Sequence, residues 1–111
     1  MKTEEKLNLT MLCDFYELTM GNGYFRAGLQ DRITYFDVFF RNVPDNGGFA
    51  VCAGLGQLVQ YIQNLHFDEE DIAFLRDKHL FSEDFLSYLR DFRFTGDIWA
   101  CLLYTSPSPR D

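Results

Sequence analysis

Largely apolar residues recur at intervals of three and four near the start of the chain. The stripe consists of Leu12, Phe15, Tyr16, Thr19, Met20 and Tyr24. Side chains at this spacing share one face of an α-helix, so we predict an amphipathic helix over about residues 10–25. Gly21 and Gly23 each weaken a helix by about 1 kcal/mol relative to Ala, which indicates close packing or early fraying near its end.

Residues 32–41 follow with side chains that alternate at the two-residue period of a β-strand. Aromatic residues occur on both faces of this segment, so we expect both faces to be covered. Residues 42–48 have the sequence Asn-Val-Pro-Asp-Asn-Gly-Gly and contain most of the turn-forming residue types. We therefore predict a hairpin turn or a functional loop there, followed by a second apolar run at residues 49–52.

Three shorter helices and a final strand are predicted in the remaining sequence. The apolar positions of residues 55–64 follow Gly54 at helical spacing, which predicts the second helix. Asp68 and Ser82 each precede acidic residues and an apolar stripe, so we expect them to cap a third and a fourth helix. Residues 92–100 return to strand character. This order of elements predicts a mixed α+β domain.

Composition narrows the functional classes. The chain of 111 residues is 47% hydrophobic and 17% aromatic, which is too apolar for a disordered segment. The net charge of −7 disfavours a nucleic-acid surface, because phosphate contacts require clustered Lys and Arg. The first eight residues are mostly polar, and no apolar run approaches the roughly 18 residues of a membrane span. We expect a cytoplasmic protein that binds neither nucleic acid nor membrane.

Familiar metal and nucleotide motifs are incomplete in this sequence. The three cysteines are widely spaced and form no Cys-x-x-Cys pair, so reduced thiols are expected. The Gly-Leu-Gly at residues 54–56 opens a helix as a dinucleotide motif would, but Val59 occupies the position of the third glycine. The acidic residues at 68–71 are better explained by a helix terminus than by a metal ion. We predict no metal site within this chain.

Residues 101–111 differ in character from the rest of the chain. Their sequence, Cys-Leu-Leu-Tyr-Thr-Ser-Pro-Ser-Pro-Arg-Asp, does not continue the preceding strand pattern. It is similar to the translation of a transposase adapter used to prepare sequencing libraries. We therefore expect a non-native tail at residues 101–111 and a native domain at residues 1–100. Removing the tail takes away one basic and one acidic residue, so the net charge stays at −7.

Asp14, Tyr16 and Arg41 are the candidate functional residues, and their residue types alone leave their roles open. A carboxylate near the start of a helix, such as that of Asp14, is most simply a partner of the helix dipole. Asp14 lies about 200° around the helix from Tyr16, so the two side chains cannot share one burial environment. Arg41 ends the predicted strand beside a glycine-containing turn, where a surface charge is as reasonable as a ligand contact.

Six segments carry a resemblance to a known family. They are Asp-Phe-Tyr-Glu-Leu-Thr-Met at 14–20, Phe-Asp-Val-Phe-Phe-Arg at 36–41, Gly-Gly-Phe-Ala at 47–50, Ala-Gly-Leu at 53–55, Phe-Ser-Glu-Asp-Phe-Leu at 81–86 and Phe-Arg-Phe-Thr-Gly-Asp at 92–97. In this order and spacing they resemble the start of nicotinate phosphoribosyltransferases, over about residues 7–100. The resemblance implies the incomplete amino-terminal mixed domain of a type II phosphoribosyltransferase, whose irregular α/β barrel is missing from this chain.

The resemblance implies a complete enzyme that joins nicotinate to phosphoribosyl pyrophosphate. The products are nicotinate mononucleotide and pyrophosphate, ATP hydrolysis is coupled, and the reaction is the first step of NAD salvage. ATP as co-substrate and Mg²⁺ are expected for the complete enzyme, because the metal neutralises the departing pyrophosphate. In this family the barrel carries most phosphate loops and the histidine that ATP phosphorylates, so this chain alone is expected to be inactive. The alternatives are a nicotinamide- or quinolinate-using relative and a free-standing α/β binding module.

The resemblance also implies roles for the three candidate residues. Tyr16 is expected to stack on the nicotinate ring across a homodimer interface and so complete the neighbouring subunit's site. Asp14 is expected to be the catalytic residue of this chain, orienting polar groups of that site, and Arg41 to contact phosphate through its guanidinium. Cys13 stands where the family commonly has threonine, and it would remove a hydroxyl hydrogen bond that orders Asp14.

Overall fold

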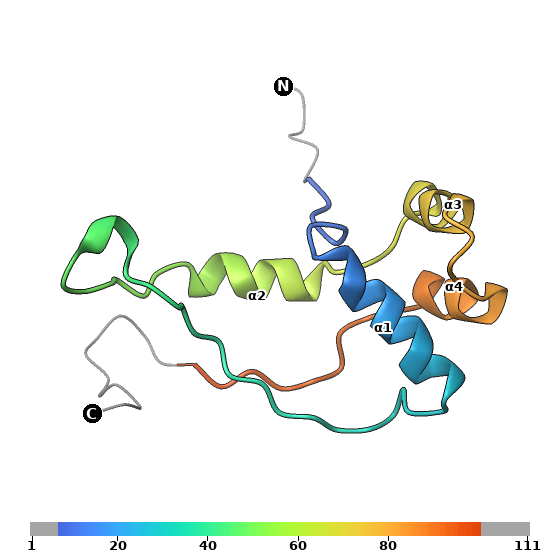
Figure 1. The fold of residues 1–111 in the computed structure, drawn as a ribbon, viewed down its shortest axis with the longest axis horizontal. Helices are drawn as coiled ribbons and strands as arrows, with labels where there is room; N and C mark the ends of the chain where they lie inside the picture. The colour runs from blue at the N-terminus through green and yellow to red at the C-terminus, as the bar shows by residue number, and fades with distance from the viewer. Residues whose placement is uncertain (1–6, 101–111) are drawn as a thin grey trace.

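The computed structural model describes residues 7–100, and its regular elements are helical (Figure 1). The elements in chain order are α1 (Phe15–Arg26), the short 3-10 turn η1 (Pro44–Asn46), α2 (Leu55–Gln63), α3 (Glu69–Asp77) and α4 (Glu83–Arg90). Helices α1, α3 and α4 gather at one end of the molecule, and α2 extends from them toward the η1 turn. No helix in this described range is long and apolar enough to cross a membrane.

The hydrophobic core lies between α3 and α4, and α1 packs on α4. Its buried members, spaced at three and four, are Ile72, Leu75, Phe85, Leu86 and Leu89. Partly buried side chains that pack against them are Met11, Leu18, Phe25, Phe67 and Phe81. Aromatic residues of α4 and of the segment just before it therefore form one side of a small three-helix core. The rings of Phe81 and Phe85 are stacked there, with their centroids 6.0 Å apart.

Two capping residues predicted from sequence fix the start of α3 and α4. Asp68 precedes α3, and its backbone N–H donates to Asp71 Oδ2 over 2.9 Å. The hydroxyl of Ser82 accepts a hydrogen bond from the backbone N–H of Phe85 over 3.3 Å, which satisfies one free donor of the first turn of α4. The predicted bounds of the second helix, and the predicted starts of the third and fourth, are confirmed to within a residue or two.

Helix α1 is joined to the start of α4 by a buried amide, a contact that we call the Asn22 junction. Asn22 Oδ1 accepts hydrogen bonds from the Ser82 backbone N–H (3.1 Å) and from the Ser82 hydroxyl (3.2 Å). Its Nδ2 lies 3.4 Å from the Leu80 carbonyl oxygen. At the preceding position, a Cβ on Gly21 would lie 3.4 Å from the Phe85 ring. A methyl group at residue 21 would therefore be in van der Waals contact with the aromatic ring on α4.

Helix α1 begins five residues later than the sequence predicts. Residues 9–12 form a turn instead, in which the Leu12 backbone N–H donates to the Leu9 carbonyl oxygen over 2.9 Å. The reason lies in Thr10, whose hydroxyl and backbone N–H are both engaged outside a helix, with His66 and Asn8 respectively. Threonine competes with helix formation in this way because its hydroxyl offers local alternatives. The predicted start near residue 10 was wrong.

The strands predicted at residues 32–41, 49–52 and 92–100 are not confirmed, since no strand occurs within residues 7–100. These segments run as unpaired connections along the molecule (Figure 1). Their side chains are open to solvent, with Val38 100% and Tyr35 94% exposed. A strand is defined by backbone pairing, and alternation alone does not supply a partner. The described part is thus helical, and the mixed α+β prediction is not confirmed there.

A turn is present within residues 42–48 as η1, where Asp45 and Asn46 take left-handed backbone angles (φ 56° and 52°) that Asp and Asn tolerate, whereas the predicted hairpin is not confirmed and the functional loop stays a prediction. The boundary predicted at residue 100 concerns residues 101–111, which lie outside the described range. The assignment of that segment as a non-native tail stays a prediction.

Candidate functional site

The amino-terminal end of α1 presents two of the three candidate residues to solvent. Asp14 is the residue that precedes the helix, in extended conformation (φ −66°, ψ 133°), and its side chain makes no capping hydrogen bond. Its carbonyl oxygen accepts from the Glu17 backbone N–H over 3.0 Å. Tyr16, in the first turn, is 58% exposed. A carboxylate and a phenol ring are therefore held at the positive end of the helix dipole, both available to a ligand or a partner.

A cluster of polar side chains, which we call the Thr10 clasp, ties the segment before α1 to the linker between α2 and α3. It consists of Asn8, Thr10, His66 and Asp68. The His66 backbone N–H donates to the Thr10 hydroxyl (3.1 Å), and the Thr10 N–H donates to Asn8 Oδ1 (3.0 Å). Asn8 Nδ2 in turn donates to the His66 carbonyl oxygen (3.1 Å) and to Asp68 Oδ2 (2.9 Å). The clasp thus fixes the chain four residues before Asp14.

The imidazole of His66 completes the clasp. Its Nε2 lies 3.0 Å from Asp68 Oδ1, and its Nδ1 lies 2.5 Å from the Asn64 carbonyl oxygen. Both ring nitrogens therefore face oxygen atoms. His66 therefore bridges the end of α2 and the start of α3. The Thr10 clasp was not predicted from the sequence, because Thr10 and His66 are 56 residues apart.

Cys13 lies between the clasp and α1 and keeps its proton. Partial burial of the thiol, followed by the nearby carboxylates of Glu17 and Asp14, raises the pKa of Cys13. The pKa of Tyr61 on α2 is raised by burial and by the neighbouring Cys13. The thiol of Cys13 thus stands where the family resemblance expects a hydroxyl. A neutral thiol is a weak hydrogen-bond partner for the Asp14 carboxylate.

Arg41 is not brought to Asp14 and Tyr16. It lies in an exposed bend just before η1, and Figure 1 shows that loop beyond the amino-terminal end of α2. The start of α1 lies at the opposite, carboxyl-terminal end of α2. The candidate residues therefore form a pair at one end of α1 and a separate cation near the turn. The proposed phosphate contact of Arg41 stays a prediction.

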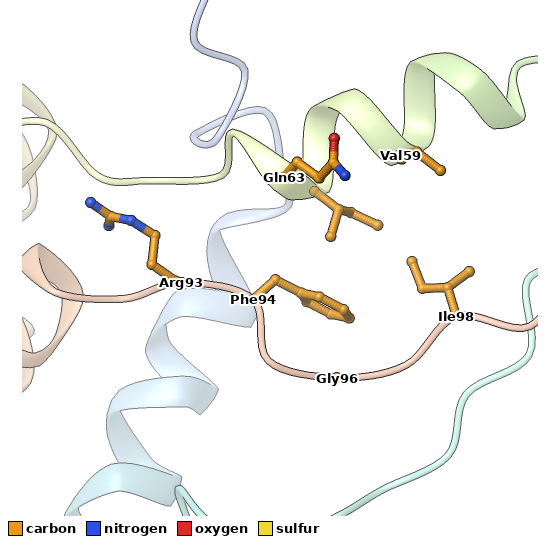
Figure 2. A pocket seen from close by; sticks show the side chains of 7 residues that line it. Val59, Gln63, Arg93, Phe94, Gly96 and Ile98 are labelled. Atoms are coloured by element: carbon orange, nitrogen blue, oxygen red, sulfur yellow. The ribbon is translucent and has the colours of Figure 1, made fainter.

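A cavity of about 270 Å³ lies between α2 and the segment that follows α4 (Figure 2). Its lining residues are Val59, Ile62, Gln63, Arg93, Phe94, Gly96 and Ile98. The Phe94 ring points into the cavity, whereas the Arg93 side chain extends away from it and donates to the Phe92 carbonyl oxygen over 2.6 Å. Convergent polar groups are what give a ligand pocket its specificity, and here only the Gln63 amide is present. The cavity is therefore an incompletely filled apolar space between α2 and the segment that follows α4.

Comparison with known proteins identifies the class to which this helical domain belongs. Residues 11–110 match the family model described as nicotinate phosphoribosyltransferase (NAPRTase) N-terminal domain. The match extends into residues 101–110, beyond the boundary predicted from sequence. The relatives are phosphoribosyltransferases by name. The chain belongs to the nicotinate phosphoribosyltransferase family and corresponds to its amino-terminal domain.

Individual relatives agree with this membership. Nicotinate phosphoribosyltransferase pncB2 of Mycobacterium tuberculosis is 38% identical over 90 residues, which cover 81% of this chain and 19% of that protein. Nicotinate phosphoribosyltransferase of Bacillus subtilis is 36% identical over 79 residues, 71% of this chain and 16% of that protein. The enzyme of that name from Caenorhabditis elegans is 36% identical over 76 residues, 68% and 14%. The chain spans less than a fifth of the length of these relatives.

Proposed function

We propose that this chain is the amino-terminal domain of a complete nicotinate phosphoribosyltransferase. That enzyme forms nicotinate mononucleotide and pyrophosphate from nicotinate and phosphoribosyl pyrophosphate, with coupled ATP hydrolysis. The observation that carries the proposal is the family match over residues 11–110, together with relatives of that name at 36–38% identity. ATP and Mg²⁺ act in the complete enzyme, and no residue of this chain is assigned to hold either.

The exposed end of α1 supports a role at the substrate site. Tyr16 contributes a flat ring, more than half open, on a helix that the core holds rigidly from its other side. Such a ring stacks on the pyridine ring of nicotinate, a contact of about 0.5–1.5 kcal/mol. In a homodimer, Tyr16 reaches the neighbouring subunit's site while Asp14, at the same end, orients polar groups there. Arg41 contacts a phosphate group from the separate loop.

The exposed apolar segments support the missing architecture. Tyr35, Phe36, Val38 and Phe39 are all largely exposed, although a stable protein buries residues of this kind. In the complete enzyme the segments 32–41 and 92–100 pair as strands, and the α+β domain so formed packs on an α/β barrel. This chain alone therefore lacks transferase activity, because the barrel supplies the remaining part of the site.

The reaction is tested with the purified complete enzyme and three substrates. Nicotinate, nicotinamide and quinolinate are each supplied with phosphoribosyl pyrophosphate, Mg²⁺ and ATP, and the mononucleotide products are separated by chromatography. Nicotinate mononucleotide is the expected product, together with ADP. Product from nicotinamide or quinolinate in its place would assign the enzyme to another branch of the family. The same assay on the 111-residue chain should give no product.

Tyr16 has a matched control in the same helix, because Tyr24 is similarly exposed at 52% against 58%. Tyr16→Ala should raise the KM for nicotinate about tenfold, since one stacking contact of about 1.4 kcal/mol corresponds to that factor. Tyr16→Phe keeps the ring and should stay within about twofold of the wild type. Tyr24→Ala should leave the KM unchanged. Equal effects of Tyr16→Ala and Tyr24→Ala would remove Tyr16 from the site.

A further inference from the structure

The end of α1 that carries Asp14 and Tyr16 is attached to the rest of the domain through the Thr10 clasp. We propose that Thr10 is a positioning residue, which sets the place of this helix end in the active site through its hydrogen bond to the His66 backbone. The inference rests on the proposed function and deepens it. It assigns a role to a buried hydroxyl that touches neither substrate nor reacting atoms.

Burial and bonding single out Thr10 among the hydroxyl groups of residues 7–100. Its side chain is only 4% exposed although it lies in a turn near the surface. The hydroxyl accepts from the His66 N–H at 3.1 Å, and the same residue's N–H is occupied by Asn8. Buried polar groups are costly unless they are paired, so this side chain is held in one arrangement. Thr10 is thereby fixed to the linker that leads into α3 and its core.

The chain segment between Thr10 and Asp14 is short and follows directly from a hydrogen-bonded turn. Three residues separate Thr10 from Asp14, and the hydrogen bond from the Leu12 N–H to the Leu9 carbonyl closes a turn over residues 9–12 that contains Thr10. A displacement of Thr10 is therefore transmitted to Asp14, because the turn can straighten only if the Leu12–Leu9 hydrogen bond is lost.

The other end of α1 acts as the pivot. The Asn22 junction fixes the helix to α4 near its carboxyl-terminal end. Residues 14 and 22 are about 12 Å apart along the axis, at 1.5 Å per residue. A tilt of about 10° around the junction would therefore move the Tyr16 end by roughly 2 Å. Misplacement of a binding group by about 1 Å can cost a hundredfold in rate, so the clasp needs to prevent only a small tilt.

The test compares Thr10→Val with Thr10→Ser in the complete enzyme. Valine keeps the shape of threonine and removes the hydroxyl, whereas serine keeps the hydroxyl. Thr10→Val should raise the KM for nicotinate about tenfold and leave the KM for phosphoribosyl pyrophosphate within about twofold. Thr10→Ser should restore the wild-type KM for nicotinate. Ser87→Ala, which removes an exposed hydroxyl on α4, is the control and should change neither constant.

Two results would overturn the inference while the wild-type enzyme makes nicotinate mononucleotide. One is an unchanged KM for nicotinate in Thr10→Val. The other is a general impairment of Thr10→Val, in which both KM values rise and kcat falls to a similar extent, with no rescue in Thr10→Ser. A merely structural role would produce that result.

A second measurement separates failure of the inference from failure of the proposed function. If the wild-type enzyme forms no nicotinate mononucleotide, the proposed function falls, and hydrogen exchange decides the inference by itself. Thr10→Val should speed exchange of the amides at residues 17–20 about tenfold and leave those of residues 86–89 unchanged, because α4 does not depend on the clasp. Equal protection of residues 17–20 in wild type and Thr10→Val would refute the positioning role.

Discussion

The Asn22 junction is the one polar contact that joins α1 to α4 inside the described part of the chain, and its loss should be measurable in both helices. Asn22→Ala removes the acceptor for the Ser82 N–H and the Ser82 hydroxyl together. The Ser82 hydroxyl also caps α4, so the substitution disturbs the cap from the outside. We expect α1 and the first turn of α4 to open more often, with the remaining core intact.

The size of the effect follows from the two hydrogen bonds. Each contributes about 0.5–1.5 kcal/mol net, so the pair accounts for about 1–3 kcal/mol. Water can partly replace Asn22 at Ser82, which is half-buried, and this keeps the value below the upper limit for a fully buried unpaired group. A change of 1.4 kcal/mol corresponds to a factor of ten, so local opening should rise by roughly 5- to 150-fold.

Native-state hydrogen exchange of the complete enzyme measures this change directly, because it reports local opening residue by residue. The amides of residues 18–25 and the Phe85 amide should exchange faster in Asn22→Ala. Asn42→Ala, at an exposed bend, is the matched control and should exchange as the wild type. A double-mutant cycle with Ser82→Ala should give a coupling energy of about 0.5–1.5 kcal/mol. Exchange of these amides within twofold of the wild type, or additive effects in the cycle, would refute the reasoning.

Three further predictions concern single side chains. Burial and nearby carboxylates raise the pKa of Cys13, and the thiolate is the form that reacts with iodoacetamide. Cys13 should therefore be alkylated more slowly than free cysteine at pH 8. Equal rates, measured by peptide mass spectrometry, would contradict this. The hydrogen bond from Arg76 lowers the pKa of Glu83, so the stability that this pair contributes is present at neutral pH and is lost as the pH falls through that lowered pKa. Urea unfolding of Glu83→Gln should therefore differ slightly from the wild type near pH 7 and not near pH 2, and an equal difference at both would be inconsistent. Gly23→Ala should stabilise α1 by about 0.5–1 kcal/mol, because its new methyl group meets no atom within 4 Å. Gly21→Ala should stabilise α1 less, since its methyl group would touch the aromatic ring on α4. Hydrogen-exchange rates of the α1 amides rank the two variants.

The helices that the sequence predicts best are those whose signals are local. Asp68 and Ser82 announce α3 and α4 because capping acts within one turn, and the apolar stripe of each helix is then buried in the core. The strands were not confirmed, because alternation records which faces need cover and not which segment provides the backbone partner. The late start of α1 was missed for a related reason, since Thr10 bonds to His66, far away in sequence.

The candidate site divides in the same way. Asp14 and Tyr16 are only two positions apart, so the sequence alone places them close together in the chain, but their position at the start of α1 was missed because the helix was predicted to begin near residue 10. Arg41 depends on the course of residues 27–54, which no short-range pattern determines. The clasp and the Asn22 junction were missed because each joins residues 56–60 positions apart. Threonine and asparagine in such roles carry no distinctive spacing.

The exposed apolar run at residues 33–40 has a consequence for the cell. It contains Ile33, Tyr35, Phe36, Val38, Phe39 and Phe40, and it carries a single charge, Asp37, and no proline. A segment with these properties templates intermolecular β-pairing when nothing covers it. Any copy of this domain without its covering partner is therefore aggregation-prone and a substrate for chaperones and proteases. If the complete enzyme covers this run as proposed, the same aromatic side chains would mark an unassembled copy for quality control.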